Sequence, residues 1–327
     1  MSTEKRTAQP VSEPEPEPES HPKTAVRHHM VPPMTNKEVT KFTAELCSFM
    51  CNQQSFATKT KEALRIIGAI HDTIRIHIVD GTRNGEPTQA AVIRFRHTSD
   101  GTREHMYVVI RGSGVAMREK WLVENNSEPT NMVQTRGMPI AYVCGAEDIR
   151  VHKGVLRGYR SIQNTVRSAI RNCAPMTRVV ITGYGFGGAI ANVAALDLAN
   201  RNRCDPYHAD IAMCLLTFGS PLWFANKTFH VSLRRLVPKH TAYSRAWDPV
   251  PRMKSTSKEY SLPQIATTWI HDRNNTSTQT PERETYETHS VAPPARVSCG
   301  FWPLCCGCGP RDNLDDHCID KIMCHLL

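Results

Sequence analysis

Hydrophobic residues near the start of the chain recur with the period of an α-helix. Over residues 35–54, apolar side chains lie three or four positions apart, on one helical face. Thr35 and Asn36 open this run, and both are residue types that cap helix N-termini. The apolar positions on the face are Val39, Phe42, Leu46, Phe49 and Met50. We therefore expect an amphipathic helix here, followed by a second helical segment over residues 63–70.

Beyond residue 72 the hydrophobic pattern changes to period two, which is typical of β-strands. Three such strands are expected, at residues 73–79, 91–95 and 105–110. The last two are joined by the turn residues Ser99, Asp100 and Gly101. Helices and strands then alternate, with helices at 158–171 and 188–200 and strands at 178–182, 211–218 and 233–238. This order predicts an α/β fold in which a mostly parallel central sheet is covered by helices on both faces.

Two other parts of the chain lack this periodicity. Glu and Pro alternate over most of residues 13–22, and the repelling charges and missing backbone donors should keep residues 1–34 extended and disordered. Residues 274–310 are rich in Ser, Thr and Pro and then in Cys, which predicts a flexible insertion. The expected organisation is a tail at 1–34 followed by one domain at 35–327.

A glycine-dense turn lies between one expected strand and the helix that follows it. Gly183, Gly185 and Gly188 satisfy the G-x-G-x-x-G fingerprint of nucleotide-binding oxidoreductases, whose backbone cradles a pyrophosphate. That fingerprint needs an acidic residue at the end of the next strand, and residues 216–219 contain none. Two other interpretations are a tight turn without chemistry and the elbow on which α/β-hydrolases carry their nucleophile.

The residues of this turn resemble the nucleophile motif of one hydrolase family. Residues 182–189 are similar to the T-G-H-S-L-G-G-A pattern of class 3 (fungal-type) lipases, with Tyr184 in place of the histidine and Gly185 in place of the serine. Further motifs follow in the order of that family. They are residues 110–113 (F-R-G-S/T), 151–155 with Tyr159 (V-H-K-G-F, with Val155 for the phenylalanine), 216–221 (T-F-G-x-P), 248–251 (D-x-V-P) and 315–317 (D-H). The chain thus resembles a class 3 lipase, which implies the α/β-hydrolase fold.

The resemblance also implies catalytic roles for the matched residues. Asp248 would orient the catalytic base His317, while Ser113 and the backbone N–H of Phe186 would bind the oxyanion. Residues of these types also have simpler interpretations. Asp248 precedes a proline and could be a turn residue, Ser113 could be a turn residue, and His317 could be a surface histidine.

Gly185 stands at the nucleophile position and has no side chain, so no acyl-enzyme can form there. The main hypothesis is therefore a pseudo-lipase that binds lipid, acyl chains or a protein partner and needs no cofactor. Trp121 and Leu122 fall in a segment similar to the family's lid helix, which favours contact with lipid. The alternative is an active triacylglycerol lipase or other carboxylic ester hydrolase, in which His317 activates a water molecule at the vacated position.

The charge of the chain suggests one class of partner. The formal net charge is +9, and residues 1–30 carry four Lys or Arg against five Glu, a net of −1, which leaves +10 for the rest. A basic body attracts anionic lipid surfaces or nucleic acid. Given the lipase resemblance, we expect a lipid or acyl ester and an anionic membrane surface as partners, and no nucleic acid. An ordinary solvated basic surface is the simpler interpretation.

Location is predicted from the lack of two signals. No window approaches 18 uncharged apolar residues, and the first 30 residues contain no apolar core of a secretory signal. These observations predict a cytoplasmic protein, whose 12 cysteines would be reduced thiols rather than a disulfide scaffold.

The C-terminal cysteines are candidates for lipidation. Cys324 is the fourth residue from the end and loosely fits a prenylation signal. Cys305, Cys306 and Cys308 follow bulky apolar residues, as in palmitoylated segments, and two such anchors would hold the chain at a membrane periphery. Unmodified thiols are an alternative. Zinc is another, but Cys305 and Cys308 lack a second cysteine pair at suitable spacing, so no metal site is predicted.

Overall fold

The computed structural model describes residues 35–51, 55–81, 88–99, 103–111, 130–131, 148–204, 211–245, 248–252 and 266–270. By contacts the chain divides into residues 1–30 and 31–327, and every described element belongs to the second unit. The predicted tail at 1–34, the lid segment that contains Trp121 and Leu122, and the insertion at 274–310 lie outside the described residues. They stay predictions.

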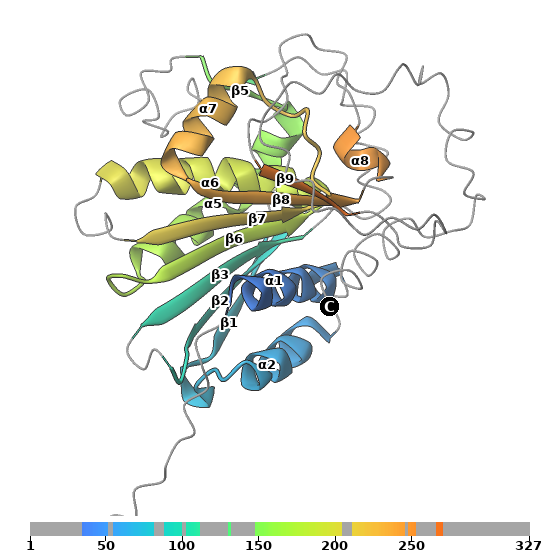
Figure 1. The fold of residues 1–327 in the computed structure, drawn as a ribbon. Helices are drawn as coiled ribbons and strands as arrows, with labels where there is room; N and C mark the ends of the chain where they lie inside the picture. Colours follow the sequence, from blue (N-terminus) through green and yellow to red (C-terminus); the bar gives the residue numbers. More distant parts are fainter. Residues whose placement is uncertain are drawn as a thin grey trace, which may run out of the picture. The chain divides into compact units, whose positions relative to one another are not determined.

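A seven-stranded sheet in the order β1-β2-β3-β6-β7-β8-β9 forms the centre of the fold (Figure 1). β1 pairs antiparallel with β2 and β2 with β3, and every later pairing in this sheet is parallel. The strands are β1 (Arg75–Asp80), β2 (Gln89–Arg96), β3 (Glu104–Ile110), β6 (Arg178–Tyr184), β7 (Ala212–Phe218), β8 (Lys239–Arg245) and β9 (Ala266–Ile270). β4 (Thr130–Asn131) and β5 (Arg150–Val151) form a separate two-stranded sheet. The predicted leading hairpin and mostly parallel sheet are confirmed.

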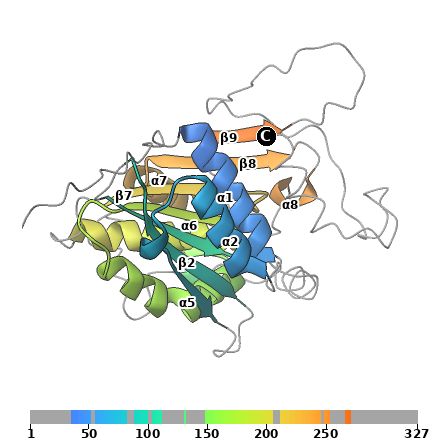
Figure 2. The same ribbon diagram turned by 90° about the horizontal axis from the view of Figure 1, so that it is seen from below.

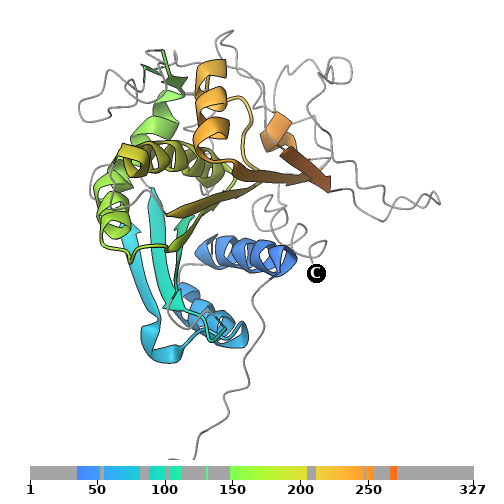
Figure 3. The same ribbon diagram turned by 60° about the vertical axis from the view of Figure 1, so that its left-hand side comes forward.

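Helices cover both faces of the sheet, as predicted (Figure 3). α1 (Asn36–Cys51) and α2 (Phe56–Ile66) pack on one face, and Figure 2 shows them in front of the strands. The opposite face carries α5 (Lys153–Arg171), α6 (Phe186–Cys204) and α7 (Lys227–Leu236). The short elements η2 (His71–Thr73) and α8 (Pro249–Arg252) lie in connections.

Alternation along the central strands produces two separate core layers. On β3, Val108 and Ile110 join the cluster beneath α5, α6 and α7, whereas Tyr107 and Val109 join the cluster beneath α1 and α2. All four side chains are buried because both faces of the strand are covered. A strand of this kind reads as a continuous apolar run, which is why the sequence indicates a covered sheet.

Two predicted elements need correction. The helix predicted at 63–70 is α2, which begins at Phe56 and ends at Ile66. It ends there because Gly68, with φ 87°, adopts the left-handed conformation that commonly follows a helix.

The strand predicted at 233–238 is wrong, because residues 227–236 form α7. The side chain of Asn226 accepts a hydrogen bond from the N–H of Phe229 at 3.1 Å and caps this helix. Phe229 and Leu233, four residues apart, are buried on one helical face. The strand that follows is β8, which begins at Lys239.

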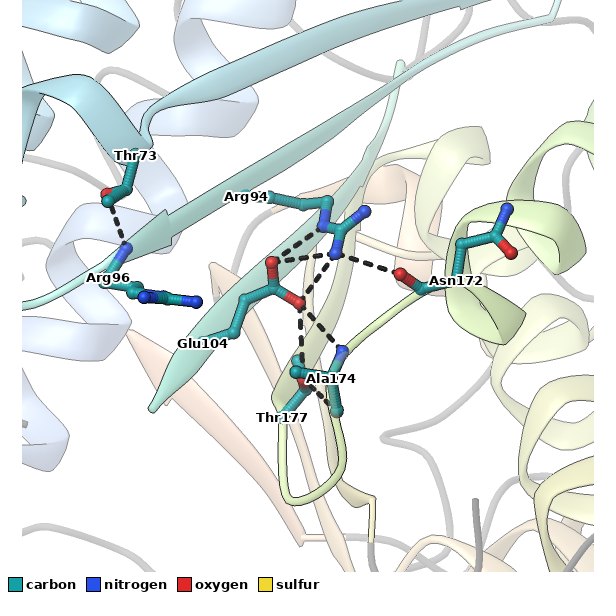
Figure 4. Close-up of polar contacts among 7 residues, drawn as sticks. All are labelled: Thr73, Arg94, Arg96, Glu104, Asn172, Ala174 and Thr177. Atoms are coloured by element: carbon teal, nitrogen blue, oxygen red, sulfur yellow. Dashed lines mark hydrogen bonds and ion pairs between the residues drawn. The ribbon is translucent and has the colours of Figure 1, made fainter. Parts of the chain in front are cut away.

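An ion pair anchors the amino ends of β3 and β6 (Figure 4). Arg94 Nε donates to Glu104 Oε1 at 3.0 Å, and Arg94 Nη2 donates to the carbonyl of Asn172 at 3.0 Å. Glu104 Oε2 accepts from the backbone N–H of Ala174 and from Thr177 Oγ1, each at 3.3 Å. These bonds hold the connection between α5 and β6 against β2 and β3. They lie at the amino end of β6, and the elbow lies at its carboxyl end.

Two buried histidines lie on the side of the sheet covered by α5, α6 and α7, and one of them, His240, should make the fold acid-sensitive. His230 on α7 is 1% exposed and His240 on β8 is 7% exposed. Burial, and then the neighbouring His230, lowers the pKa of His240 from 6.5 to about 3. The pKa of His240 is lower in the folded state than in the unfolded state. Protonation therefore costs no stability above pH 6.5 and lowers the free energy of unfolding as the pH falls from 6.5 toward 3. The slope for this one proton is about 1.4 kcal/mol per pH unit.

This expectation is checked by urea unfolding between pH 4.5 and pH 8, at intervals of about half a unit around the window that His240 defines. His240→Leu should lower the slope of unfolding free energy against pH by about 1.4 kcal/mol per pH unit, the contribution of one proton. Equal slopes in the wild type and His240→Leu would show that His240 does not set the acid limit.

Candidate functional site

A single residue forms the turn between β6 and α6. β6 ends at Tyr184, α6 begins at Phe186, and Gly185 alone connects them, with φ +54°. The N–H of Gly185 donates to the carbonyl of Phe218 at 2.8 Å, and its carbonyl accepts from the N–H of Gly188 at 2.9 Å. Gly185 is therefore held at the carboxyl edge of the sheet, in a conformation that L side chains rarely adopt.

The surroundings of Gly185 differ from those of the other elbow glycines. At Gly187, a Cβ atom would lie 2.5 Å from the carbonyl oxygen of Arg111, so glycine is required for the end of β3 to approach α6. At Gly185, a Cβ atom would meet no atom within 4 Å in the described part of the chain. A side chain at position 185 would therefore point into open space above the elbow.

The close approach at Gly187 places the end of β3 beside the start of α6. Ile110 pairs with Gly183 across the sheet, and Arg111 follows it directly. Phe186 is the first residue of α6, so its N–H belongs to the first turn, where the helix dipole is positive. The described end of β3, at Arg111, thus meets the N-terminus of α6 at this point.

Asp248 lies between β8 and α8 and is only 3% exposed. Its Oδ1 accepts a hydrogen bond from the N–H of Val250 at 2.9 Å. A Cβ atom on Gly219 would lie 2.9 Å from Asp248 Oδ2 and 3.1 Å from Tyr184 Cε2. Gly219, with φ +54°, therefore has both a backbone reason and a packing reason to be glycine.

The strand register brings these residues to one edge. Gly185 follows β6, Gly219 follows β7, and Asp248 follows β8, three neighbouring parallel strands. The N–H of Gly219 donates to the carbonyl of Tyr243 on β8 at 2.8 Å, just as the N–H of Gly185 donates to β7. Carboxyl ends of parallel strands form the usual ligand-binding edge of α/β folds.

The described residues include only part of the predicted site. Gly185, Phe186 and Asp248 are described and lie at the same edge of the sheet. Their predicted roles stay predictions. The predicted site residues that lie outside the described residues are Ser113, Trp121, Leu122, Cys305, Cys306, Cys308, His317 and Cys324.

Sequence reasoning missed a contact beneath the elbow. Cys47 Sγ on α1 lies 3.3 Å from Thr182 Oγ1 on β6, and both side chains are fully or almost fully buried. Burial raises the pKa of the Cys47 thiol to about 12, so it is neutral and unsuited as a replacement nucleophile. Helical periodicity marks Cys47 as a core position, but it carries no signal for its partner on a strand 135 residues away.

Two further searches concern metals and membranes. Among the described residues, no group of three or more His, Cys, Asp or Glu side chains is placed to hold a metal ion. None of the described helices is both long and apolar enough to cross a membrane.

Solved structures with the same architecture are fungal-type lipases, so the fold is that of an α/β-hydrolase. A triacylglycerol lipase whose catalytic centre is described as a serine protease triad matches 73% of this chain and 82% of its own, with TM-score 0.52 and 20% identity. Lipase II from Rhizopus niveus matches 72% of this chain and 80% of its own, with TM-score 0.52 and 20% identity. The Rhizomucor miehei lipase–propeptide complex matches 73% and 70%, with TM-score 0.51 and 21% identity. At these identities the likeness shows the fold alone.

Sequence comparison supports one family within that fold. Residues 107–258, from β3 to beyond Asp248, match the family described as lipase (class 3). The secreted mono- and diacylglycerol lipase 1 of Fusarium solani is 28% identical over 174 residues, which are 50% of this chain and 46% of that protein. The match thus spans about half the length of this curated relative. Together these findings support a likeness to class 3 lipases over about half of the chain.

The same relative overturns the predicted location. The sequence was interpreted as that of a cytoplasmic protein held at a membrane periphery by lipidation, whereas the Fusarium solani protein is named as secreted. The prediction is wrong. It rested on two features that were not found in the sequence, a membrane-spanning stretch and a secretory signal, and such absences do not determine where a folded protein is located.

Proposed function

We propose that this chain is a pseudo-lipase, which binds an acyl lipid at the carboxyl edge of its sheet and forms no acyl-enzyme. The observation that carries the proposal is Gly185 itself. It occupies the turn on which an α/β-hydrolase carries its nucleophile, it keeps the positive φ of that turn, and it offers no hydroxyl or thiol.

The remaining parts of the proposed site support binding over covalent chemistry. A serine esterase needs a nucleophile, a base, an orienting carboxylate and oxyanion donors. We assign the carboxylate to Asp248, the base to His317, and the oxyanion donors to Ser113 and the Phe186 N–H. Without the hydroxyl, these groups can still hold an ester carbonyl in the open space at Gly185.

The acyl lipids to examine first are mono- and diacylglycerols, because those are the lipids named for the Fusarium solani relative. Trp121 and Leu122 belong to the proposed lid and would contact the acyl chain. No cofactor takes part in this function.

The open space at Gly185 also favours a second candidate, a slow hydrolase. A water molecule there would give its proton to His317, and the resulting hydroxide would add to the ester carbonyl. The tetrahedral intermediate would then collapse, and His317 would return the proton to the leaving alcohol. Loss of a triad member leaves about 10³- to 10⁴-fold acceleration over water in serine proteases, so such turnover would be small.

The test is to assay the wild-type chain with p-nitrophenyl butyrate and with mono- and diacylglycerol, and to measure binding of a fluorescent monoacylglycerol ether, which cannot be hydrolysed. We expect binding without a burst and turnover far below an ordinary kcat of about 10 s⁻¹. Gly185→Leu should fill the open space and weaken binding, whereas Gly185→Ala should retain most of it. Turnover at an ordinary lipase rate, or no binding of any acyl lipid, would contradict the proposal.

A further inference from the structure

The outer side of α7 carries a stripe of cations around one exposed apolar residue. Lys227, Val231, Arg234 and Arg235 stand at positions i, i+4, i+7 and i+8, which is one face of a helix. All four are exposed, and Val231 retains 46% of its surface. The opposite side of the helix, including Phe229, is buried against the core. We call these four residues the α7 stripe.

The charge of the α7 stripe is not balanced by nearby acidic residues in the sequence. Residues 211–247 contain five Lys or Arg and no Asp or Glu. Asp148, whose carbonyl accepts a bond from the Asn226 side chain at the start of α7, has its own carboxylate engaged by Arg150 at 2.6 Å. Within the described ranges, no ion pair involves the three cations of the stripe.

Helix stability does not account for the arrangement. Arg234 and Arg235 lie in the last turn, where cations favour the helix dipole. Lys227, however, is the first residue of α7, where a cation opposes the dipole. Val231 lies exposed between them, and as a β-branched residue it has a lower helix propensity than an unbranched one. Cations gathered on one exposed face are instead suited to an anionic lipid surface, which attracts each Lys or Arg near it by about 1 kcal/mol.

We propose that the α7 stripe docks this protein on an anionic lipid surface. The three cations would contact headgroup phosphates and carboxylates, and Val231 would enter the headgroup layer. The inference depends only on α7 and its charges, and so it holds or fails separately from lipid binding at Gly185.

The test is co-sedimentation of the full chain with phosphatidylcholine vesicles that contain or lack phosphatidylserine. We expect binding only with phosphatidylserine, and a steep loss of binding as salt is raised well above physiological strength. The variant Lys227→Glu/Arg234→Glu/Arg235→Glu should lower the partition coefficient by more than about tenfold. The control Lys37→Glu/Lys61→Glu/Arg65→Glu makes the same charge change at exposed positions on α1 and α2 and should bind much more strongly than the α7 variant.

Three results would overturn the proposal: no wild-type binding to anionic vesicles, equal binding to neutral ones, or equal loss in both triple variants, which would indicate the general field of a basic body. Binding of an RNA oligonucleotide through the α7 stripe, without vesicle binding, would assign the surface to nucleic acid instead. The wild-type salt series shows whether binding is electrostatic, and the single variant Arg235→Glu, which should bind anionic vesicles more weakly than Lys61→Glu, tests the α7 stripe if the triple variant fails to fold. Val231→Ser should weaken binding with an unchanged salt slope.

Discussion

Gly185→Ser should turn the chain into a measurable esterase, with turnover of p-nitrophenyl butyrate about 10²- to 10⁴-fold above the wild type. The reason is geometric. The backbone at position 185 already has the φ of +54° that the elbow imposes, and a Cβ there points into open space. A serine hydroxyl would therefore enter the site without displacing a described atom.

The substitution should also lower stability. A non-glycine residue at positive φ costs about 1–3 kcal/mol, and no packing contact within 4 Å offsets that strain in the described residues. Gly185→Ala bears the same backbone strain without a hydroxyl and is the matched control. Both variants should lose similar unfolding free energy in urea, and only the serine variant should gain activity.

Two outcomes separate the possible causes of failure. Adding Asp248→Asn to Gly185→Ser should return turnover to the Gly185→Ala background, because the base would lose its orienting carboxylate. A folded Gly185→Ser variant without activity would contradict the assigned base and oxyanion donors, since Gly185 would then not be the single missing part. Activity that survives Asp248→Asn would contradict the role of Asp248 instead.

Most of the fold could be predicted from the sequence because its signals are local. The elbow motif, the covered strands and the amphipathic face of α1 each depend on residues close together in the chain. The end of α7 was mistaken for a strand because the short window 233–238 contains the apolar residues Leu233, Leu236 and Val237 but too few residues to show a helical period. The cap that identifies the helix, Asn226 bonded to Phe229, lies upstream of that window.

The site was predictable as a set of motifs but not as an arrangement. Asp248 was proposed from its D-x-V-P motif, whereas its close approach to Gly219 depends on the register of neighbouring parallel strands. The bond between Cys47 and Thr182 likewise joins elements that share no sequence pattern. The hydrophobic period of a strand or helix indicates which of its faces is buried. It does not indicate which other strand or helix packs against that face.

Arg167→Leu should destabilise the fold by about 3 kcal/mol, because it removes the main partner of a fully buried carboxylate. Asp197 on α6 has no exposed side-chain surface and accepts two bonds from Arg167 on α5, at 2.7 and 2.8 Å. Arg201 Nε at 3.2 Å and the Tyr159 hydroxyl at 2.5 Å complete the group. Burial and then the Asp197 charge raise the pKa of Tyr159 well above its usual value, so this hydroxyl keeps its proton and remains a donor.

A double variant distinguishes a buried charge from simple packing. Arg167→Leu leaves the Asp197 carboxylate buried with fewer partners, whereas Arg167→Leu/Asp197→Leu removes both polar groups and should recover much of the lost stability in urea unfolding. Arg150→Leu breaks an exposed pair with Asp148 and should cost less than about 1 kcal/mol. If the double variant were as unstable as the sum of the Arg167→Leu and Asp197→Leu changes, the two side chains would contribute independently, and an unpaired Asp197 carboxylate would not explain the loss. Recovery would instead show that Arg167→Leu is costly because it leaves the buried Asp197 carboxylate without its main partner, and that side-chain packing is enough to join α5 to α6.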